Sequence, residues 1–377
     1  MTNPLCQMLG IDFPLFAFSH CRDVVAAVSK AGGFGVLGAT AFNPEQLEVE
    51  LQWIDAHVDG KPYGLDVLIP ENMAVKAETG LTAGKLAARI PQAHRDFTDG
   101  LLAAHGVAPA GTHARAREDA PPPFWPEEAM ELLHVAFKHP IKLIANALGV
   151  PPPEMIALGR EHGVPVAALA GAKEHALRLA EAGVDIIVAQ GGEAGGHCGE
   201  VSTLVLIPEV VRALKAAGLA RPVLAAGGIM TGEQMAACMA MGAAGAWTGS
   251  VWLSTTESEC SEIFREKMVA ARSRDTVRSK GRTGKYSRQL KSAWTDAWEG
   301  AESPGALPMP MQSLIAEPAI RQATKAAEGG NVKARELVTY FVGQGVGLVD
   351  SVTSARSVVQ SFMEDYADAV EVLNGAI

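Results

Sequence analysis

An apolar run passes directly into a glycine-rich loop in the segment Val184-Asp185-Ile186-Ile187-Val188-Ala189-Gln190-Gly191-Gly192-Glu193-Ala194-Gly195-Gly196-His197-Cys198-Gly199. Five of its last ten residues are glycine, and the ionisable residues Glu193 and His197 stand among them. Glycine loses more conformational freedom on folding than any other residue, so such a cluster destabilises a protein unless its backbone must approach another group. A glycine cluster directly after a strand therefore indicates a loop that contacts something planar or anionic.

The apolar run before this loop is the sixth of eight runs, nearly all of them separated by helical patterns. They begin near residues 14, 33, 63, 141, 165, 185, 222 and 244. Eight alternating units predict an α/β fold, a (β/α)8 TIM barrel. The runs lack strict alternation, as expected of parallel strands buried on both faces. The alternative is a doubly wound open sheet, which needs a glycine fingerprint after the first strand, where this chain has Phe18-Ser19-His20-Cys21.

The rest of the chain divides around this barrel. We expect residues 1–255 to form the barrel, with 71–129 as an extended excursion that contains a helix over 83–105. Residues 256–315 read as a basic insertion containing Trp and Pro, and residues 316–377 as C-terminal helices that pack on the barrel. Together these two segments predict a mostly helical C-terminal appendage that covers the barrel mouth.

Composition excludes several classes of protein. The 377 residues are 48% hydrophobic and carry a net charge of -10, which argues against a general nucleic-acid binder. The five cysteines are scattered without a CxxC pair, so we expect neither a metal site nor a disulfide framework. No apolar run approaches the length of a membrane span and the N-terminus lacks a signal sequence, so we expect a cytoplasmic protein with reduced thiols.

In a barrel of this kind the site lies at the C-terminal ends of the strands, and phosphate groups are typically held by the loops after the seventh and eighth. Those loops here contain Gly227-Gly228 and Gly249-Ser250. Glycines allow backbone N–H groups to approach phosphate oxygens, and the helix after Thr231 would add its positive end. The alternative is that these glycines only form tight turns.

His197 lies on the same mouth, beyond the sixth strand. An imidazole exchanges protons near neutral pH, so His197 is a candidate base for a carbon acid or a donor to a developing oxyanion. The alternative is a histidine that only bonds its own loop. Glu193 reads as an acceptor that stabilises the loop, while His20 and Asp66 also point toward the mouth with either a functional or a structural role.

A basic run follows the barrel, from Arg272 to Lys291. It has two interpretations: a solvated helix face, or recognition of a phosphorylated substrate tail such as coenzyme A or a nicotinamide nucleotide. Trp294 and Trp298, four residues apart, indicate packing rather than a stacking platform.

Four motifs together resemble the nitronate monooxygenase family, formerly called 2-nitropropane dioxygenases. They are Gln190 to His197, Ala225 to Ile229, Met241-Gly242-Ala243 with Thr248-Gly249-Ser250, and Gly343-Gln344-Gly345. The resemblance covers the chain from Pro14 to about Val359. It implies a TIM barrel that binds FMN and acts on a small molecule, with the phosphate on Gly227, Gly228, Gly249 and Ser250.

The resemblance also assigns roles to single residues. It places His197 at the position of the family's catalytic histidine. The other implied FMN contacts are Ala17, Phe18, Asp66, Gln190, Gly195, Gly196 and Gln344. Relatives often carry a Gln-Ala-Pro-Met-like stretch where this chain has Phe16 to Ser19, and asparagine where Asp66 stands.

The implied reaction is oxidation of a nitronate or nitroalkane with O2 to a carbonyl compound and nitrite. Related barrels give the alternative of an NAD(P)H-dependent flavin reductase that acts on a quinone or an enoyl thioester. A second alternative is a non-catalytic barrel that binds flavin or phosphate. We also expect no nucleic-acid or membrane partner, and a homodimer as one possible assembly.

Overall fold

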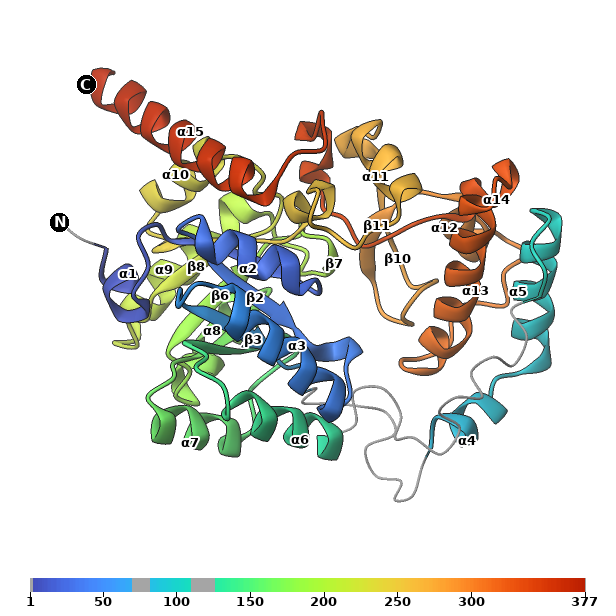
Figure 1. Cartoon of the computed structure of the whole chain (residues 1–377), viewed down its shortest axis with the longest axis horizontal. Helices are drawn as coiled ribbons and strands as arrows, with labels where there is room; N and C mark the ends of the chain where they lie inside the picture. The colour runs from blue at the N-terminus through green and yellow to red at the C-terminus, as the bar shows by residue number, and fades with distance from the viewer. Residues whose placement is uncertain (1–2, 70–81, 110–125, 377) are drawn as a thin grey trace.

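Eight parallel strands close into a barrel in the computed structural model, which describes residues 3–69, 82–109 and 126–376 (Figure 1). The barrel strands are β1 (Leu15–Ser19), β2 (Phe34–Gly38), β3 (Tyr63–Asp66), β4 (Leu143–Asn146), β5 (Val166–Ala170), β6 (Ile186–Gln190), β8 (Val223–Ala226) and β9 (Gly245–Thr248). They pair in chain order, and β9 returns to pair with β1. The predicted (β/α)8 barrel is therefore confirmed.

Large apolar side chains fill the barrel interior. Phe16 lies 5.1 Å from Phe34 between ring centroids and 6.1 Å from Trp247, with all three almost fully buried. Successive residues of a strand point to opposite sides, so Ala17, the next residue, belongs to the separate cluster that faces the helices. Because both sides of each strand are buried, the runs are continuously apolar, as the sequence indicated.

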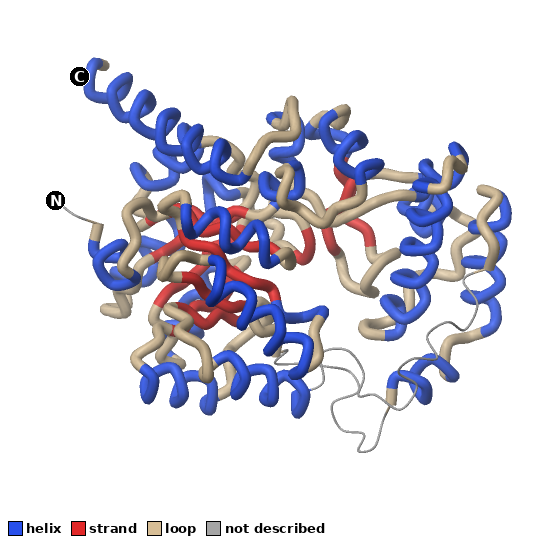
Figure 2. Tube along the Cα trace, viewed as in Figure 1, coloured by secondary structure: helices blue, strands red, loops and turns tan. Residues whose placement is uncertain are grey.

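Helices surround the barrel on its outer side (Figure 2). They are α2 (Arg22–Lys30), α3 (Pro44–His57), α6 (Pro126–Ala136), α7 (Pro153–His162), α8 (Lys173–Glu181), α9 (Thr203–Ala216) and α10 (Gly232–Ala240), with α1 (Pro4–Leu9) preceding the first strand.

Helix α3 shows how the local sequence sets these helices. Asn43 caps its first turn by accepting from the Gln46 amide, and Pro44 occupies the first helical position. Leu47, Leu51 and Ile54 are fully buried on one face, and burial of each such side chain stabilises the fold by about 1.5–3 kcal/mol.

One predicted helix has different bounds. The expected helix over 83–105 is two helices, α4 (Ala83–Ala88) and α5 (Gln92–Ala104), because Pro91 lacks an N–H and caps the second helix instead. Helix α9 begins at Thr203 and contains Pro208.

The basic run is not a helix. It forms a β-hairpin of β10 (Thr276–Ser279) and β11 (Ser287–Leu290), and β11 also pairs with the short strand β7 (Gly196–His197). The prediction of a solvated helix face is therefore wrong, and the hairpin instead extends the glycine-rich loop into a three-stranded sheet.

The hairpin belongs to a lobe beside the barrel, with α11 (Glu262–Val269), α12 (Ala293–Glu299), α13 (Met311–Glu328) and α14 (Val332–Leu337) (Figure 1). Helix α5 from the excursion joins this lobe, because Asn331 Nδ2 donates to the carbonyls of His105 and Gly106. Trp294 and Trp298 are buried in it, so the prediction that they pack is confirmed.

The last helix, α15 (Ala355–Gly375), packs on α10 and α2 at the side of the barrel. Phe362, on the inner face of α15, is buried in this contact. No helix in the described ranges is both long enough and apolar enough to cross a membrane.

Candidate active site

The glycine-rich loop leaves β6 at the C-terminal end of the barrel and returns as β7. Gln190, the last residue of β6, is half-buried and pairs with Ala226 of β8. In β7, His197 lies opposite Ser287 of the hairpin and Gly196 lies opposite Arg288. The loop is thus fixed between the barrel and the hairpin.

The His197 ring is oriented by the hairpin backbone. Its Nδ1 lies 3.2 Å from the Tyr286 carbonyl oxygen, which only accepts hydrogen bonds, so Nδ1 carries the proton in the neutral ring. Nε2 is then the unprotonated nitrogen. Burial lowers the pKa of His197 below its ordinary value, and this effect outweighs the bond to Tyr286, which raises it. His197 is therefore a neutral imidazole at neutral pH, and its acceptor nitrogen has no hydrogen-bond partner among the described residues.

Glu193 caps a helix. Its carboxylate accepts from both the amide and the hydroxyl of Thr203, at 2.9 Å each, at the first turn of α9. A carboxylate in this position satisfies amides that the helix leaves open and opposes its positive end. The interpretation of Glu193 as a loop-stabilising acceptor is confirmed.

Thr203 carries no motif or spacing that marks it as a site residue in the sequence. Its hydroxyl also lies 2.9 Å from the Gly227 carbonyl oxygen, so it ties the loop after β6 to the loop after β8.

At several glycines of these loops, neighbouring backbone leaves no room for a side chain. A Cβ on Gly195 would lie 2.9 Å from the backbone of Val342 and Gly343. The Gln344 amide donates to the Glu193 carbonyl at 2.8 Å, and the Gly343 amide donates to Ser250 Oγ at 2.8 Å. The segment from Gly343 to Gln344 thus packs on the loops after β6 and β9.

Gly227 and Gly228 both have positive φ, at 112° and 71°, so they form a turn that other residues rarely adopt. A Cβ on Gly228 would also lie 2.9 Å from Glu193 Cβ. Gly196 and Gly249 differ, because a Cβ on either would meet no described atom within 4 Å. The open side of these two glycines is not explained by packing.

Helix α10 begins shortly after this turn, at Gly232. Its first amide, of Gly232, donates to the Asp365 carboxylate of α15 at 3.4 Å. The prediction that this helix adds its positive end to a phosphate site stays a prediction.

Aromatic residues line the end of β1 at the mouth. Phe18 lies 5.1 Å from the His20 ring and 6.4 Å from the Trp247 ring, between centroids. His20 is held by its Nδ1, which lies 2.9 Å from the Gly38 carbonyl, and burial lowers its pKa. Trp247 had not been selected from the sequence, because it lies within an apolar strand.

Asp66 ends β3 with its side chain inside the barrel, on the opposite side from Leu65, which faces the helices. It is 3% exposed, and its Oδ1 has no hydrogen-bond partner among the described residues. Burial raises the pKa of Asp66 from 3.8 to about 7. A polar group that is buried without a partner costs free energy, so Asp66 is a candidate for a binding or catalytic role.

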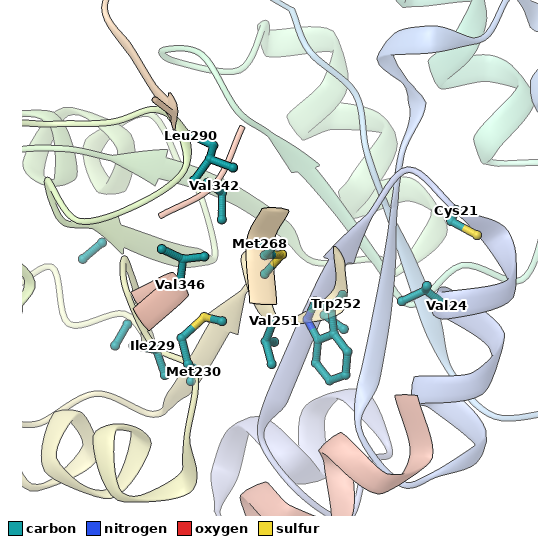
Figure 3. Packing of buried hydrophobic residues seen from close by; sticks show 14 of the residues in the cluster. Cys21, Val24, Ile229, Met230, Val251, Trp252, Met268, Leu290, Val342 and Val346 are labelled. Atoms are coloured by element: carbon teal, nitrogen blue, oxygen red, sulfur yellow. The ribbon is translucent and has the colours of Figure 1, made fainter. Parts of the chain in front are cut away.

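A shared hydrophobic cluster joins the mouth loops to the lobe. Met230 and Val251 from the barrel loops pack with Met268, Val342 and Val346 of the later chain, as Figure 3 shows. This cluster holds the 342–346 segment at the mouth.

Acidic side chains pair with many cations of the basic run. Arg272, Arg278, Arg282 and Lys291 pair with Asp275, Glu200, Glu317 and Asp296, respectively. Arg274, Lys280 and Lys285 remain exposed on the hairpin side.

Two other features lie away from this mouth. A cavity of about 360 Å³ is lined by Cys6, Phe13, Pro14 and Tyr366 and lies before β1, at the opposite end of the barrel. Cys21, Asp23 and Glu259 place ligand atoms within 4.8 Å of one another, although the two carboxylates are exposed. Neither feature contacts His197.

A closed barrel with its candidate site at the C-terminal mouth is a TIM barrel with the arrangement of an enzyme. The nitronate monooxygenase family model matches residues 3–365, so the chain belongs to the nitronate monooxygenase family. It is a flavin-dependent oxidoreductase that acts on small molecules.

Similar sequences agree with this assignment. A Mycobacterium tuberculosis protein with the name "Putative monooxygenase Rv1533" is 51% identical, and the match covers 100% of both chains. A Staphylococcus aureus (strain Newman) protein named "Probable nitronate monooxygenase" is 28% identical over 91% of each chain.

Similar solved structures share the whole fold. Nitroalkane oxidase from Streptomyces ansochromogenes matches with a TM-score of 0.78 at 25% identity, over 98% of this chain and 99% of that one. FabK from Thermotoga maritima matches with a TM-score of 0.73 at 25% identity, over 100% of both chains.

Proposed function

We propose that the chain is an FMN-dependent enzyme that oxidises nitroalkanes or nitronates with O2 to a carbonyl compound and nitrite. The observation that carries this proposal is the neutral His197, whose Nε2 is left unprotonated by the bond from Nδ1 to Tyr286. The family match and the likeness to a nitroalkane oxidase support the substrate class.

The mouth loops fit the phosphate of FMN. The open side of Gly249 leaves room for a phosphate group next to the backbone. Ser250 Oγ accepts from the Gly343 amide, so its own hydrogen stays available for a phosphate oxygen. Gly227 and Gly228 would line the same group, with Gln190, Asp66 and Phe18 toward the ring. FMN, when bound, supplies the electron acceptor.

The protein side chain that would take part in the reaction is His197, which would act as a base. A neutral Nε2 can remove the proton from the carbon next to a nitro group, which forms the nitronate. An already ionised nitronate does not need this step. The lowered pKa of His197 therefore suits a neutral nitroalkane as the substrate that enters the site.

This role of His197 is tested with His197→Asn, which keeps a polar side chain without a base. We expect unchanged FMN content, with a loss of kcat/KM on the order of 100-fold or more for the nitroalkane and a smaller loss for the preformed nitronate. Equal turnover by the variant and the wild type on the neutral nitroalkane would remove His197 from the mechanism.

A second candidate is an NAD(P)H-dependent reductase that acts on a quinone or an enoyl thioester. The exposed cations Arg274, Lys280 and Lys285 favour it, because they suit the phosphates of a nicotinamide nucleotide or of coenzyme A. The non-catalytic alternative is wrong, because the family is one of oxidoreductases.

Anaerobic mixing separates the two candidates. Bleaching of the bound flavin by a nitronate, with nitrite formed after O2 is admitted, supports the first candidate. Bleaching by NADH or NADPH alone supports the second. A purified protein that takes up no FMN would contradict both.

A further inference from the structure

We propose that Arg288 is a positioning residue for His197, and that the hairpin of β10 and β11 sets which ring nitrogen of His197 carries the proton. This inference rests on the proposed function, in which His197 Nε2 contacts the substrate. It concerns residues outside the barrel, which act on the site through the glycine-rich loop.

The Arg288 guanidinium binds the loop backbone directly. Its Nε and one terminal nitrogen donate to the Gly192 carbonyl, at 3.1 and 2.7 Å, while the other terminal nitrogen donates to Thr276 Oγ1 at 3.2 Å. Arg288 is only 9% exposed, so these bonds lie largely away from water. Two charge-assisted donors on one carbonyl hold that peptide in place.

Three consecutive hairpin residues hold the loop at separate points. The Tyr286 carbonyl accepts from His197 Nδ1, Ser287 lies opposite His197 in the ladder, and Arg288 lies opposite Gly196. The side-chain bond of Arg288 attaches the loop at Gly192, and the ladder attaches it again at Gly196 and His197. The His197 backbone and ring are thus fixed by the same strand.

The loop needs external attachment because its own sequence restrains it little. Gly196, directly before His197, has φ of 73° and open space around its missing side chain. Glycine populates many backbone conformations at similar energy. Without the hairpin, the imidazole would therefore sample positions in which Nε2 does not face the substrate.

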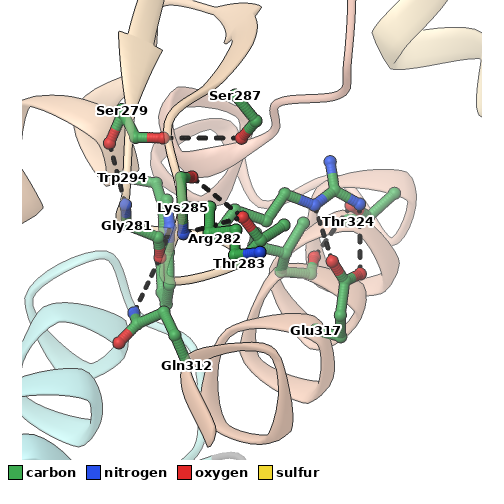
Figure 4. A network of polar contacts seen from close by, with 11 residues as sticks. Ser279, Gly281, Arg282, Thr283, Lys285, Ser287, Trp294, Gln312, Glu317 and Thr324 are labelled. Carbon is green, nitrogen blue, oxygen red and sulfur yellow. Dashed lines mark hydrogen bonds and ion pairs between the residues drawn. The ribbon is translucent and has the colours of Figure 1, made fainter. Parts of the chain in front are cut away.

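The far end of the hairpin is anchored in the lobe, as Figure 4 shows. The Gly281 carbonyl accepts from Trp294 Nε1 at 3.2 Å and from Gln312 Nε2 at 2.8 Å. Arg282 forms two bonds with the Glu317 carboxylate, at 2.7 and 3.0 Å. The end of the hairpin that lies away from the glycine-rich loop is therefore fixed to the lobe.

The test is Arg288→Met in the FMN-loaded enzyme, which keeps the apolar stem and removes every donor. We expect normal FMN content and a loss of kcat/KM for a neutral nitroalkane on the order of 10- to 100-fold, because small displacements of a catalytic group have effects of this size. Arg288→Lys, which keeps one donor, should lose less.

A second measurement reports on the ring itself. With ¹⁵N-labelled histidine, NMR gives the protonated nitrogen and the pKa of His197 in each variant. Loosening the loop should expose the ring, so Arg288→Met should raise its pKa toward the ordinary value and mix the two neutral forms. Lys285, the charged side chain that acts on His197, is unchanged in these variants.

Arg278→Met is the matched control. Arg278 lies directly opposite Arg288 in the hairpin and pairs with exposed Glu200. The Arg278 guanidinium also lies over the Tyr286 ring, 5.5 Å from its centroid, but donates to no backbone group of the glycine-rich loop among the described residues. An ion pair with one partner 84% exposed contributes little, so we expect kcat/KM within about threefold of wild type and an unchanged His197 pKa.

The double variant with His197→Asn separates the possible outcomes. If Arg288 acts through His197, adding Arg288→Met to His197→Asn causes no further loss. The inference would be overturned if the two substitutions lowered kcat/KM independently of each other. It would also be overturned if Arg288→Met kept the wild-type kcat/KM and the wild-type pKa of His197. If Arg288→Met does not fold, Arg288→Lys takes its place. The inference is then overturned if His197 in Arg288→Lys has the same pKa and the same protonated nitrogen as in the wild type. If His197→Asn itself keeps full turnover, the proposed function fails instead.

Discussion

Asp66→Asn is expected to stabilise the flavin-free protein in a way that depends on pH. The carboxyl is 3% exposed and its pKa in the fold is raised to about 7, against 3.8 in an unfolded chain. A difference of about 3 between these pKa values corresponds to about 4 kcal/mol. This is the free energy that the fold loses when the buried group ionises.

The sign follows from proton binding. Between about pH 4 and pH 7 the folded chain holds a proton on Asp66 that the unfolded chain has released, so stability from this group falls as pH rises through that range. Asparagine has the same shape and does not ionise. The advantage of Asp66→Asn should therefore grow from near zero at about pH 4 to roughly 4 kcal/mol at about pH 8.

Urea unfolding of both proteins at several pH values measures this difference. Asp368→Asn, at an exposed position on α15, is the control for the change in net charge. A difference between Asp66→Asn and wild type that stays constant with pH would refute the reasoning. If the variant is more stable but binds FMN less tightly, the buried acid is kept for function at the expense of stability.

Three further predictions concern the cofactor site, the lobe and the pH of turnover. Gly249→Val should fold normally, because a Cβ there meets no described atom within 4 Å, yet bind FMN at least about tenfold more weakly in flavin titrations; unchanged affinity would argue against this loop as the phosphate site. Glu317→Gln should destabilise the protein by on the order of 2 kcal/mol in urea unfolding, because Arg282, whose side chain is 5% exposed, loses its charged partner. The expected loss is smaller than for a fully buried ion pair, since the Glu317 side chain is 36% exposed. The acid side of the pH profile of kcat/KM should have its midpoint below 6.5, since burial lowers the pKa of His197; a midpoint above 6.5 would contradict the neutral imidazole.

The barrel could be predicted because each of its strands carries its own signal. Runs such as Ile186–Gln190 are apolar throughout, since both faces of a barrel strand are buried. The loops after the sixth, seventh and eighth strands follow from the strand count alone. Those features need no knowledge of distant contacts.

The hairpin could not be predicted in this way. Residues 276–290 carry Arg278, Lys280 and Arg288, which suggested a solvated surface. Their strand conformation depends on pairing with Gly196 and His197, which lie about 90 residues earlier in the chain. Pairing between distant segments leaves little trace in local sequence.

The role of Glu193 was anticipated, but its partner was not. Helix α9 begins at Thr203, where the Glu193 carboxylate caps it from the preceding loop. A cap supplied by a side chain ten positions away does not follow the usual N-cap spacing.

The attachment of the hairpin at both ends links the integrity of the lobe to turnover. Proteins open in cooperative units, and a lobe beside a closed barrel can open while the barrel stays folded. Opening of the lobe would release Gly281 and Arg282, and with them the strand that holds His197. We therefore expect heat to inactivate the enzyme before the barrel melts, with recovery on cooling as the lobe closes again.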